Sequence, residues 1–268
     1  MHQPVLPLPT LSLPTLSSCS TASLLCLLGL TAQAGLPEVV AAAKPAVVAV
    51  GTYNLLASPR FAFRGTGFVV GDGRTLVTNA HVVPDEVTEQ RQLTLQLGGN
   101  RAANQDAATE TRKLTLLALD RVHDLAVLQI AGDALPVLTL DANDSAREGQ
   151  AVAFIGFPIG GLLGFSPVTH RATVSSITPI ALPPPNARQL DAASVARLRQ
   201  GPFNIYQLDG TAYPGNSGGP LFDVETGRVV GVINMVLVKT SKESLLSNPS
   251  GITYAIPVRF VRELLGSP

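Results

Sequence analysis

Short apolar segments that are typical of β-strands recur along this chain and restrict the folds available to it. In residues 92–97 apolar and polar side chains alternate strictly, as in a strand with one buried face. Further short apolar or alternating segments, each bounded by Gly, Pro, Asn or Asp, span residues 113–119, 124–130, 151–156, 203–208 and 228–234. Strands of this length and spacing predict an all-β protein built from barrels.

A polar segment at residues 141–145 divides these strands into two groups. We therefore expect a first barrel at about 45–140 and a second barrel at about 146–256. Helices are few. Residues 37–43 predict a short helix that stops before a proline, and residues 257–265 begin with proline and carry apolar side chains at helical spacing. This C-terminal helix should pack on the second barrel.

Composition and charge indicate a globular protein without a strong electrostatic preference. The chain is 46% hydrophobic, with 24 Gly and 21 Pro, which suits a strand-rich core joined by many turns. Lys plus Arg equals Asp plus Glu at 19 each, so no long-range field favours nucleic acid or a membrane surface. No phosphate-binding loop is visible, and no Cys or His cluster has the spacing of metal ligands. We expect neither a metal nor an organic cofactor.

Residues 1–34 have the features of a signal peptide, although the usual Lys or Arg near the start is missing. A short apolar segment at residues 24–30 precedes Ala32-Gln33-Ala34, which predicts cleavage after Ala34. The apolar segment is far shorter than the roughly 20 residues that span a membrane, so stable insertion is not expected. Both cysteines, Cys19 and Cys26, lie within residues 1–34, so residues 35–268 would fold without disulfides. The prediction is a periplasmic or secreted protein.

The segment Gly215-Asn216-Ser217-Gly218-Gly219-Pro220 is the strongest indication of chemistry. A serine among small residues can expose its hydroxyl while neighbouring backbone N–H groups converge, which is what an acyl-transfer nucleophile needs. The same letters fit the elbow of α/β-hydrolases, in which the histidine follows the serine. All four histidines of this chain precede Ser217, so any base for it must come from upstream.

Two upstream segments offer the partners of Ser217. His81 stands where the apolar segment 76–83 ends, and Asp124 begins the segment 124–130. Alone, the serine turn would more often be a hairpin, His81 a packed histidine and Asp124 a strand cap. Together they have the order histidine, aspartate, serine, and the chain resembles the trypsin-like serine proteases, in particular the HtrA (Deg) family. The matching segments are 65–70, 77–83, 124–128, 215–219, 231–234 and 254–257.

The resemblance implies a fold of two six-stranded antiparallel barrels of the chymotrypsin type with a C-terminal helix. It also implies that His81 is the general base, that Asp124 orients it and that Ser217 is the nucleophile. The backbone N–H groups of Gly215 and Ser217 would form the oxyanion hole. The substrates would be unfolded or exposed polypeptides, in envelope protein quality control. Homotrimers are common in the family, which allows a homo-oligomer here.

Substrate preference is predicted from the gapless match around the serine. Thr211 falls at the floor of the primary specificity pocket, where it offers no counter-ion to a basic side chain. Asn234, Met235 and Val236 fall at the pocket wall and at the edge that pairs with the substrate backbone, so uncharged aliphatic side chains are favoured. Because the chain ends at Pro268, we expect no PDZ domain of the kind that HtrA proteins carry.

Three polar residues near these motifs receive other interpretations. Asp120 is predicted to be solvated, and His123 is predicted to be structural and to face away from Asp124, its neighbour along an expected strand. His170 has no partner that the sequence identifies. Two functions remain as alternatives to an endopeptidase. One is a non-catalytic peptide-binding or chaperone-like protein of the same fold, and the other is a serine esterase.

Overall fold

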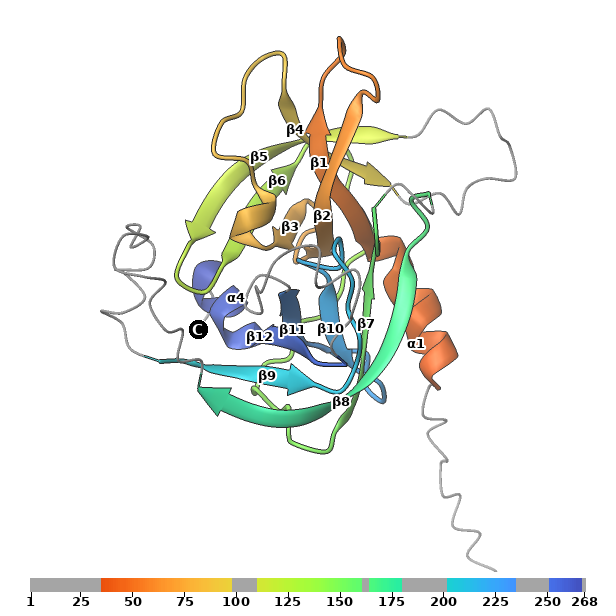
Figure 1. Ribbon diagram of the computed structural model, residues 1–268, viewed down its shortest axis with the longest axis vertical. Helices are drawn as coiled ribbons and strands as arrows, with labels where there is room; N and C mark the ends of the chain where they lie inside the picture. The colour runs from red at the N-terminus through yellow and green to blue at the C-terminus, as the bar shows by residue number, and fades with distance from the viewer. Residues whose placement is uncertain (1–34, 98–109, 161–163, 180–201, 235–250, 267–268) are drawn as a thin grey trace, which may run out of the picture. The chain divides into compact units, whose positions relative to one another are not determined.

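The structure is a computed structural model that describes residues 35–97, 110–160, 164–179, 202–234 and 251–266. The expected signal peptide, Met235 and Val236 lie outside these residues, and so do most of the segments that join β4 to β5 and β8 to β9. The described residues form two closed antiparallel barrels of six strands each (Figure 1). The predicted fold class is confirmed.

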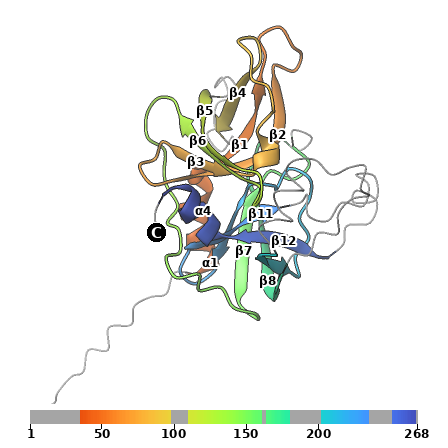
Figure 2. The same ribbon diagram turned by 90° about the vertical axis from the view of Figure 1, so that its left-hand side faces the viewer.

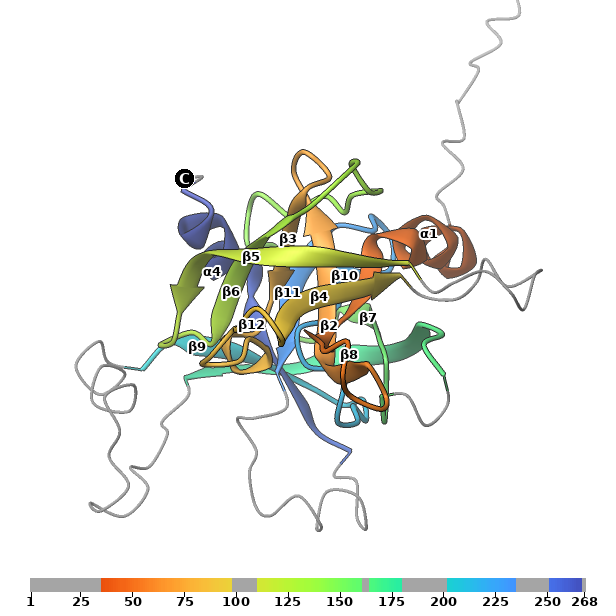
Figure 3. The same ribbon diagram turned by 90° about the horizontal axis from the view of Figure 1, so that it is seen from above.

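The first barrel closes in the order β1-β2-β3-β6-β5-β4. Seen from above, the long strand β5 runs alongside β4 and β6, with both of which it pairs (Figure 3). β1 pairs with both β2 and β4, which closes the sheet. The strands are β1 (Val47–Tyr53), β2 (Phe61–Val70), β3 (Thr75–Thr78), β4 (Gln92–Leu97), β5 (Thr111–Asp120) and β6 (Leu125–Ile130).

The second barrel closes in the order β10-β11-β12-β9-β8-β7. Here β7 pairs with both β8 and β10. The strands are β7 (Ala151–Gly156), β8 (Val168–Pro179), β9 (Asn204–Leu208), β10 (Pro220–Asp223), β11 (Val229–Asn234) and β12 (Thr253–Pro257). The order of the strands is the same in both barrels, apart from where the numbering starts.

The core explains why several strands are apolar at consecutive positions. In β1, Val48 and Val50 pack inside the first barrel, whereas Val47 and Ala49 belong to a core built by both barrels. In β7, Val152 and Phe154 likewise pack inside the second barrel, whereas Ala153 and Ile155 belong to the shared core. A strand that is buried on both faces loses the polar half of its alternation. The shared core joins the two barrels.

Two short helices cover the shared core. The helix α1 (Leu36–Ala43) begins one residue earlier than predicted and buries Val39 and Ala43 there. The helix α4 (Val258–Leu264) follows β12 directly and buries Val258, Phe260 and Val261. It lies beside β5 and β6 as well as β11 and β12, so it contacts both barrels and not only the second (Figure 2). No helix within the described ranges is long and apolar enough to cross a membrane.

Candidate active site

Ser217 lies in the turn that precedes β10, and glycine gives this turn its shape. Gly215 has φ +105° and Gly218 has φ +85°, which L side chains rarely adopt. A Cβ atom on Gly215 would meet the carbonyl oxygen of Phe157 at 2.2 Å. The turn is closed by bonds from the Asn216 N–H to the Tyr213 oxygen, 3.0 Å, and from the Gly219 N–H to the Asn216 oxygen, 3.0 Å.

Thr66, in β2 of the first barrel, holds this serine turn from the other barrel. Its N–H donates to the carbonyl oxygen of Ser217 at 2.8 Å, and its hydroxyl donates to that of Gly215 at 2.6 Å. The hydroxyl also accepts from the N–H of Phe157 at 3.1 Å. Thr66 lies within a segment that carries the family resemblance, but no sequence pattern assigns it this role.

The same turn packs against the strand end that leads to His81. A Cβ atom on Gly218 would lie 2.4 Å from the Thr78 hydroxyl and 3.1 Å from the Asn79 nitrogen. The fold therefore brings the serine turn next to β3, and His81 follows two residues after Asn79. Ser217 itself is buried, with 5% of its surface exposed.

His81 stands in a single 3₁₀ turn (Ala80–Val82) directly after β3. Arg64, from β2, fastens this turn with two hydrogen bonds. Its Nε donates to the Val82 carbonyl oxygen at 2.5 Å and its Nη2 to that of His81 at 3.1 Å. Burial lowers the pKa of Arg64, and the positive charge of Arg91 lowers it further, whereas Asp85 raises it. No sequence pattern indicates this role for Arg64.

Asp124 contacts His81 at two points. One carboxylate oxygen, Oδ2, lies 2.6 Å from the His81 Nδ1, and the other, Oδ1, accepts from the His81 backbone N–H at 2.9 Å. Asp124 precedes β6 in the tight turn that connects β5 to β6, and its φ of +54° is in the left-handed region. Only 8% of its surface is exposed. The two contacts fix both the position and the orientation of the imidazole relative to the carboxylate.

Two asparagines complete the surroundings of Asp124. The Nδ2 of Asn234, at the end of β11, donates to Asp124 Oδ2 at 2.7 Å across the two barrels. The Nδ2 of Asn79 and the N–H of Ala80 donate to the Asp124 carbonyl oxygen at 2.9 and 3.0 Å. Asn234 is fully buried. Its side chain therefore holds the Asp124 carboxylate, a contact that the sequence did not predict.

The peptide before Gly215 is oriented by a neighbouring loop. The N–H of Ile159 donates to the carbonyl oxygen of Pro214 at 2.7 Å. Because the C=O and N–H of a trans peptide point in opposite directions, the Gly215 N–H points away from Ile159.

Of the residues predicted to line the specificity pocket, the structure describes Thr211 and Asn234. Thr211 is half-buried, and the next N–H, that of Ala212, donates to the Thr253 hydroxyl at 2.9 Å. That hydroxyl donates in turn to the Gly210 carbonyl oxygen at 2.5 Å. These bonds attach the segment that leads to the serine turn to β12.

Asp120 is partly buried and paired with His123, so the prediction that it is solvated was wrong. Its Oδ2 lies 2.6 Å from the Nδ1 of His123, and its Oδ1 accepts from the backbone N–H groups of Val122 and His123 at 2.9 and 3.0 Å. Burial alone would raise the pKa of Asp120, but the hydrogen bonds from His123 and Val122 outweigh it and lower that pKa. The chain turns immediately after Asp120, which brings His123 back to the Asp120 carboxylate. The charges of the neighbouring residues do not reveal such a turn.

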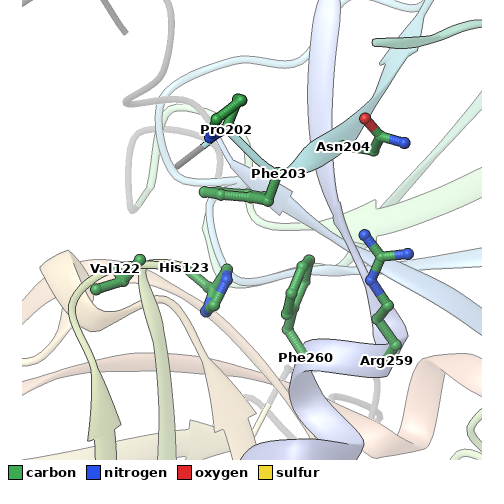
Figure 4. Close-up of a pocket in the computed structure, with 7 residues that line it drawn as sticks. All are labelled: Val122, His123, Pro202, Phe203, Asn204, Arg259 and Phe260. Atoms are coloured by element: carbon green, nitrogen blue, oxygen red, sulfur yellow. The ribbon is translucent and has the colours of Figure 1, made fainter. Parts of the chain in front are cut away.

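His123 lies in the turn between β5 and β6 rather than in a strand, and its ring packs on two phenylalanine rings. Its ring stacks on Phe260 of α4 at 3.8 Å between centroids and meets the edge of Phe203 at 4.6 Å (Figure 4). The guanidinium of Arg259 lies 4.6 Å from the Phe260 ring centre. These residues line a cavity of about 370 Å³ together with Val122, Pro202 and Asn204.

His170, left without a partner by the sequence, lies beneath the serine turn. Its ring stacks on Phe154 at 4.7 Å, and its Nε2 lies 3.4 Å from the Nδ2 of Asn216. Burial lowers the pKa of His170, which favours the neutral ring. Among the described residues, no three His, Cys, Asp or Glu side chains are arranged to hold a metal ion.

Comparison with known proteins identifies the family. Residues 65–232 match the trypsin-like peptidase domain. A probable periplasmic serine endoprotease of the DegP-like kind from Halomonas elongata is 30% identical over 200 residues, which cover 72% of this chain and 32% of the relative. The mitochondrial serine protease HTRA2 of Drosophila willistoni is 29% identical over 207 residues, which cover 77% of this chain and 39% of the relative. The chain thus spans less than half the length of these relatives.

The fold is also found among solved structures. The HtrA-type protease AlgW, solved with a tripeptide, matches with a TM-score of 0.59 at 24% identity, covering 87% of this chain and 63% of that one. Three observations agree: the two closed barrels, the order of the segments that carry the family resemblance, and the match to residues 65–232. The chain belongs to the trypsin-like peptidase family.

Proposed function

We propose that this chain is a serine endopeptidase in which Ser217 attacks the peptide carbonyl, His81 takes the serine proton and Asp124 orients His81. The observation that carries the proposal is the two-point contact of the Asp124 carboxylate with the Nδ1 and the backbone N–H of His81. A carboxylate at Nδ1 fixes the tautomer in which Nε2 is free to accept a proton. The position of the serine turn against β3 agrees with this arrangement.

The chemistry follows from the weakness of a serine hydroxyl as a nucleophile at neutral pH. His81 would remove the hydroxyl proton as the Ser217 oxygen bonds to the carbonyl carbon, and Asp124 would stabilise the resulting imidazolium. His81 would then give that proton to the leaving amine. His81 would next take a proton from a water molecule as the water oxygen bonds to the acyl carbon. It would return that proton to the Ser217 oxygen as the acyl–serine bond breaks, which releases the acid product.

The oxyanion of the intermediate would be bound by the backbone N–H groups of Gly215 and Ser217. The Ile159 bond to Pro214 supports this role, because it turns the Gly215 N–H away from the Ile159 side of the loop. Each such donor contributes about 3 kcal/mol of transition-state stabilisation. The Thr66 bonds to the carbonyl oxygens of Gly215 and Ser217 hold the loop in this orientation before substrate arrives.

We further propose uncharged aliphatic side chains in unfolded polypeptides as the preferred cleavage sites. Thr211 supplies no charge to a pocket at this place, and Met235 and Val236 would form its wall and the edge that pairs with the substrate. Asn234, predicted to lie beside them, has a fully buried side chain that bonds to Asp124 instead. The Halomonas elongata relative is named periplasmic. Together with the expected signal peptide at residues 1–34, this supports an exported enzyme that acts in envelope protein quality control.

A serine-directed fluorophosphonate tests the proposal. Residues 35–268 should be labelled and should cleave casein, and Ser217→Ala should lose both reactions while its circular dichroism and thermal unfolding stay unchanged. Casein cleavage that persists in a pure Ser217→Ala preparation would show that Ser217 is not the nucleophile. Labelling without casein cleavage would instead favour an esterase, and the absence of both would favour a non-catalytic peptide-binding protein.

A further inference from the structure

The loop that orients the Gly215 peptide contains a residue in an unfavourable backbone conformation. Residues 157–160 form a turn in which the N–H of Gly160 donates to the carbonyl oxygen of Phe157 at 3.4 Å. Pro158 is the second residue, and Ile159, the third, has φ +57°. Proline followed by a positive φ is the pattern of a type II turn, whose third position favours Gly or Asn. A β-branched residue with positive φ is an outlier.

This outlier donates the hydrogen bond on which the oxyanion hole depends. The Ile159 N–H donates to the Pro214 carbonyl oxygen at 2.7 Å. Ile159 is 37% exposed, and it is neither a member of the described hydrophobic cores nor among the residues packed against them. The contribution of Ile159 to the site therefore comes from its backbone.

The same four residues have a second conformation that would suit isoleucine better. A type I turn also accepts proline in its second position, but the φ of its third residue is negative, at about −90°. The two turn types differ mainly by rotation of the peptide between the second and third residues, here the peptide of Pro158 and Ile159. That rotation carries the Ile159 N–H to the opposite side of the turn, away from Pro214. Relief of the strain and loss of the bond are thus one event.

The surroundings of the turn fix its ends. A Cβ atom on Gly160 would meet the ring of Phe63 at 1.9 Å, and one on Gly215 would meet the Phe157 oxygen at 2.2 Å. The rings of Phe63 and Phe157 are 6.4 Å apart, edge to face. Packing therefore holds Phe157 and Gly160 against β2 and the serine turn. The peptide between Pro158 and Ile159 is the part of the turn that can change without displacing these contacts.

We propose that Ile159 is a positioning residue that sets how much of the enzyme has a formed oxyanion hole. In one conformation its N–H holds the Pro214 carbonyl and the Gly215 N–H is available to substrate. In the other, Pro214 loses this donor and the Gly215 peptide is free to turn. The penalty for an L residue with positive φ corresponds to a factor of roughly 5–30 in population. This inference rests on the proposed roles of Ser217 and Gly215.

Substitutions at Ile159 that differ in their tolerance of positive φ test the proposal. Ile159→Gly and Ile159→Asn remove most of the penalty, whereas Ile159→Val keeps a β-branched residue. We expect kcat for a peptide substrate, and the rate of fluorophosphonate labelling, to rise several-fold for Gly and less for Asn. Ile159→Val should show no rise in either, and KM should change little in all three variants. Leu56→Ala, at a position 86% exposed, is the control whose rates should equal those of the wild type. The expected order follows backbone preference and not the size or polarity of the side chain.

The outcomes separate this inference from the proposed function. If the wild type is labelled at Ser217 but Ile159→Gly has the same or a lower kcat, the inference is overturned and the endopeptidase stands. A higher melting temperature of Ile159→Gly with unchanged kcat also overturns it, because the strain would then oppose folding alone. If no variant reacts at Ser217, the proposed function itself fails. A glycine variant that reacts faster than the wild type supports both.

Discussion

At the scale of single residues, the site depends on how the carboxylate of Asp124 is surrounded. Its Oδ2 faces the His81 ring and receives the amide of Asn234, while its Oδ1 receives the His81 backbone N–H. These donors come from both barrels. The carboxylate is thus held in place by groups that do not take part in the proposed proton transfer, and the imidazole is held by the carboxylate.

Asp124→Asn should lower kcat by about 10⁴-fold, because an amide beside Nδ1 favours the wrong tautomer of His81. KM should change little. Steady-state kinetics on a peptide substrate measure both constants. Asp120→Asn is the matched control, since this carboxylate pairs with His123 and not with His81. Comparable losses of kcat in the two variants would show that Asp124 is not the acid of the site.

Arg64→Met should lower kcat by roughly 10-fold to 100-fold, because a shift of His81 by about 1 Å or less is enough to cause a loss of this size. The variant keeps an unbranched apolar chain but loses the donors to the carbonyl oxygens of His81 and Val82. Arg60→Met, in the exposed loop between β1 and β2, should have no effect. Unchanged kcat in Arg64→Met would mean that the 3₁₀ turn holds His81 without the guanidinium.

At the scale of elements, the turn between β5 and β6 is a small unit with its own charge pair. Asp120 accepts three hydrogen bonds from within the turn, which ends at Asp124 with a positive φ. In the same turn, His123 packs on the ring of Phe260 in α4 and on that of Phe203, directly before β9. The turn therefore links the acid of the proposed triad to the C-terminal helix.

The lowered pKa of Asp120 predicts how this turn responds to acid. A carboxyl whose pKa is lower in the folded protein than its ordinary 3.8 stabilises the fold when ionised. That stability is present above pH 3.8 and is lost as the pH falls through the folded pKa. Asp120→Asn should therefore be less stable than the wild type at pH 7, and the difference should shrink well below pH 3.8. Urea unfolding at several pH values measures it, with the exposed Asp133→Asn as control. If the wild type and Asp120→Asn differed in stability by the same amount at every pH, the ionised Asp120 would not stabilise the fold through its contact with His123.

At the scale of the whole molecule, the barrels share one core, to which α1 and α4 also contribute. Val47 and Phe68 enter it from the first barrel, and Ile155 and Phe222 enter it from the second. The serine turn contacts β2 and β3, and its residues are not part of the shared core. Residues that the proposed mechanism needs together come from different barrels, so their spacing depends on how the shared core packs.

Phe222→Ala, in the shared core, should destabilise the protein by about 3–5 kcal/mol. Phe222 is fully buried, so the change leaves a cavity between the barrels. Because both barrels use this core, unfolding in denaturant should remain a single transition that moves as a whole. Leu56→Ala, at a position 86% exposed, should leave stability unchanged. Two separate transitions, with one of them unmoved, would show that the barrels unfold independently.

Much of the fold could be predicted from the sequence because its signals are local. Alternating or apolar segments bounded by turn residues marked strands such as β4, β7 and β11, and proline before an apolar helical pattern marked α4. The family motifs that contain His81, Asp124 and Ser217 are likewise short. The prediction that Asp120 is solvated was wrong, because its partner His123 approaches through a turn whose geometry depends on the positive φ at Asp124.

The sequence by itself therefore determined the fold class, the family and the candidates for the proposed triad. The tertiary structure alone decided what holds those candidates. Asn234 reaches Asp124 across 110 residues, Thr66 reaches Gly215 across 149, and Ile159 meets Pro214 through backbone atoms. Such contacts leave no periodicity or motif, because residues far apart in the chain meet only when both barrels have closed. A backbone donor also has no side-chain signature, so the sequence cannot reveal the bond from Ile159.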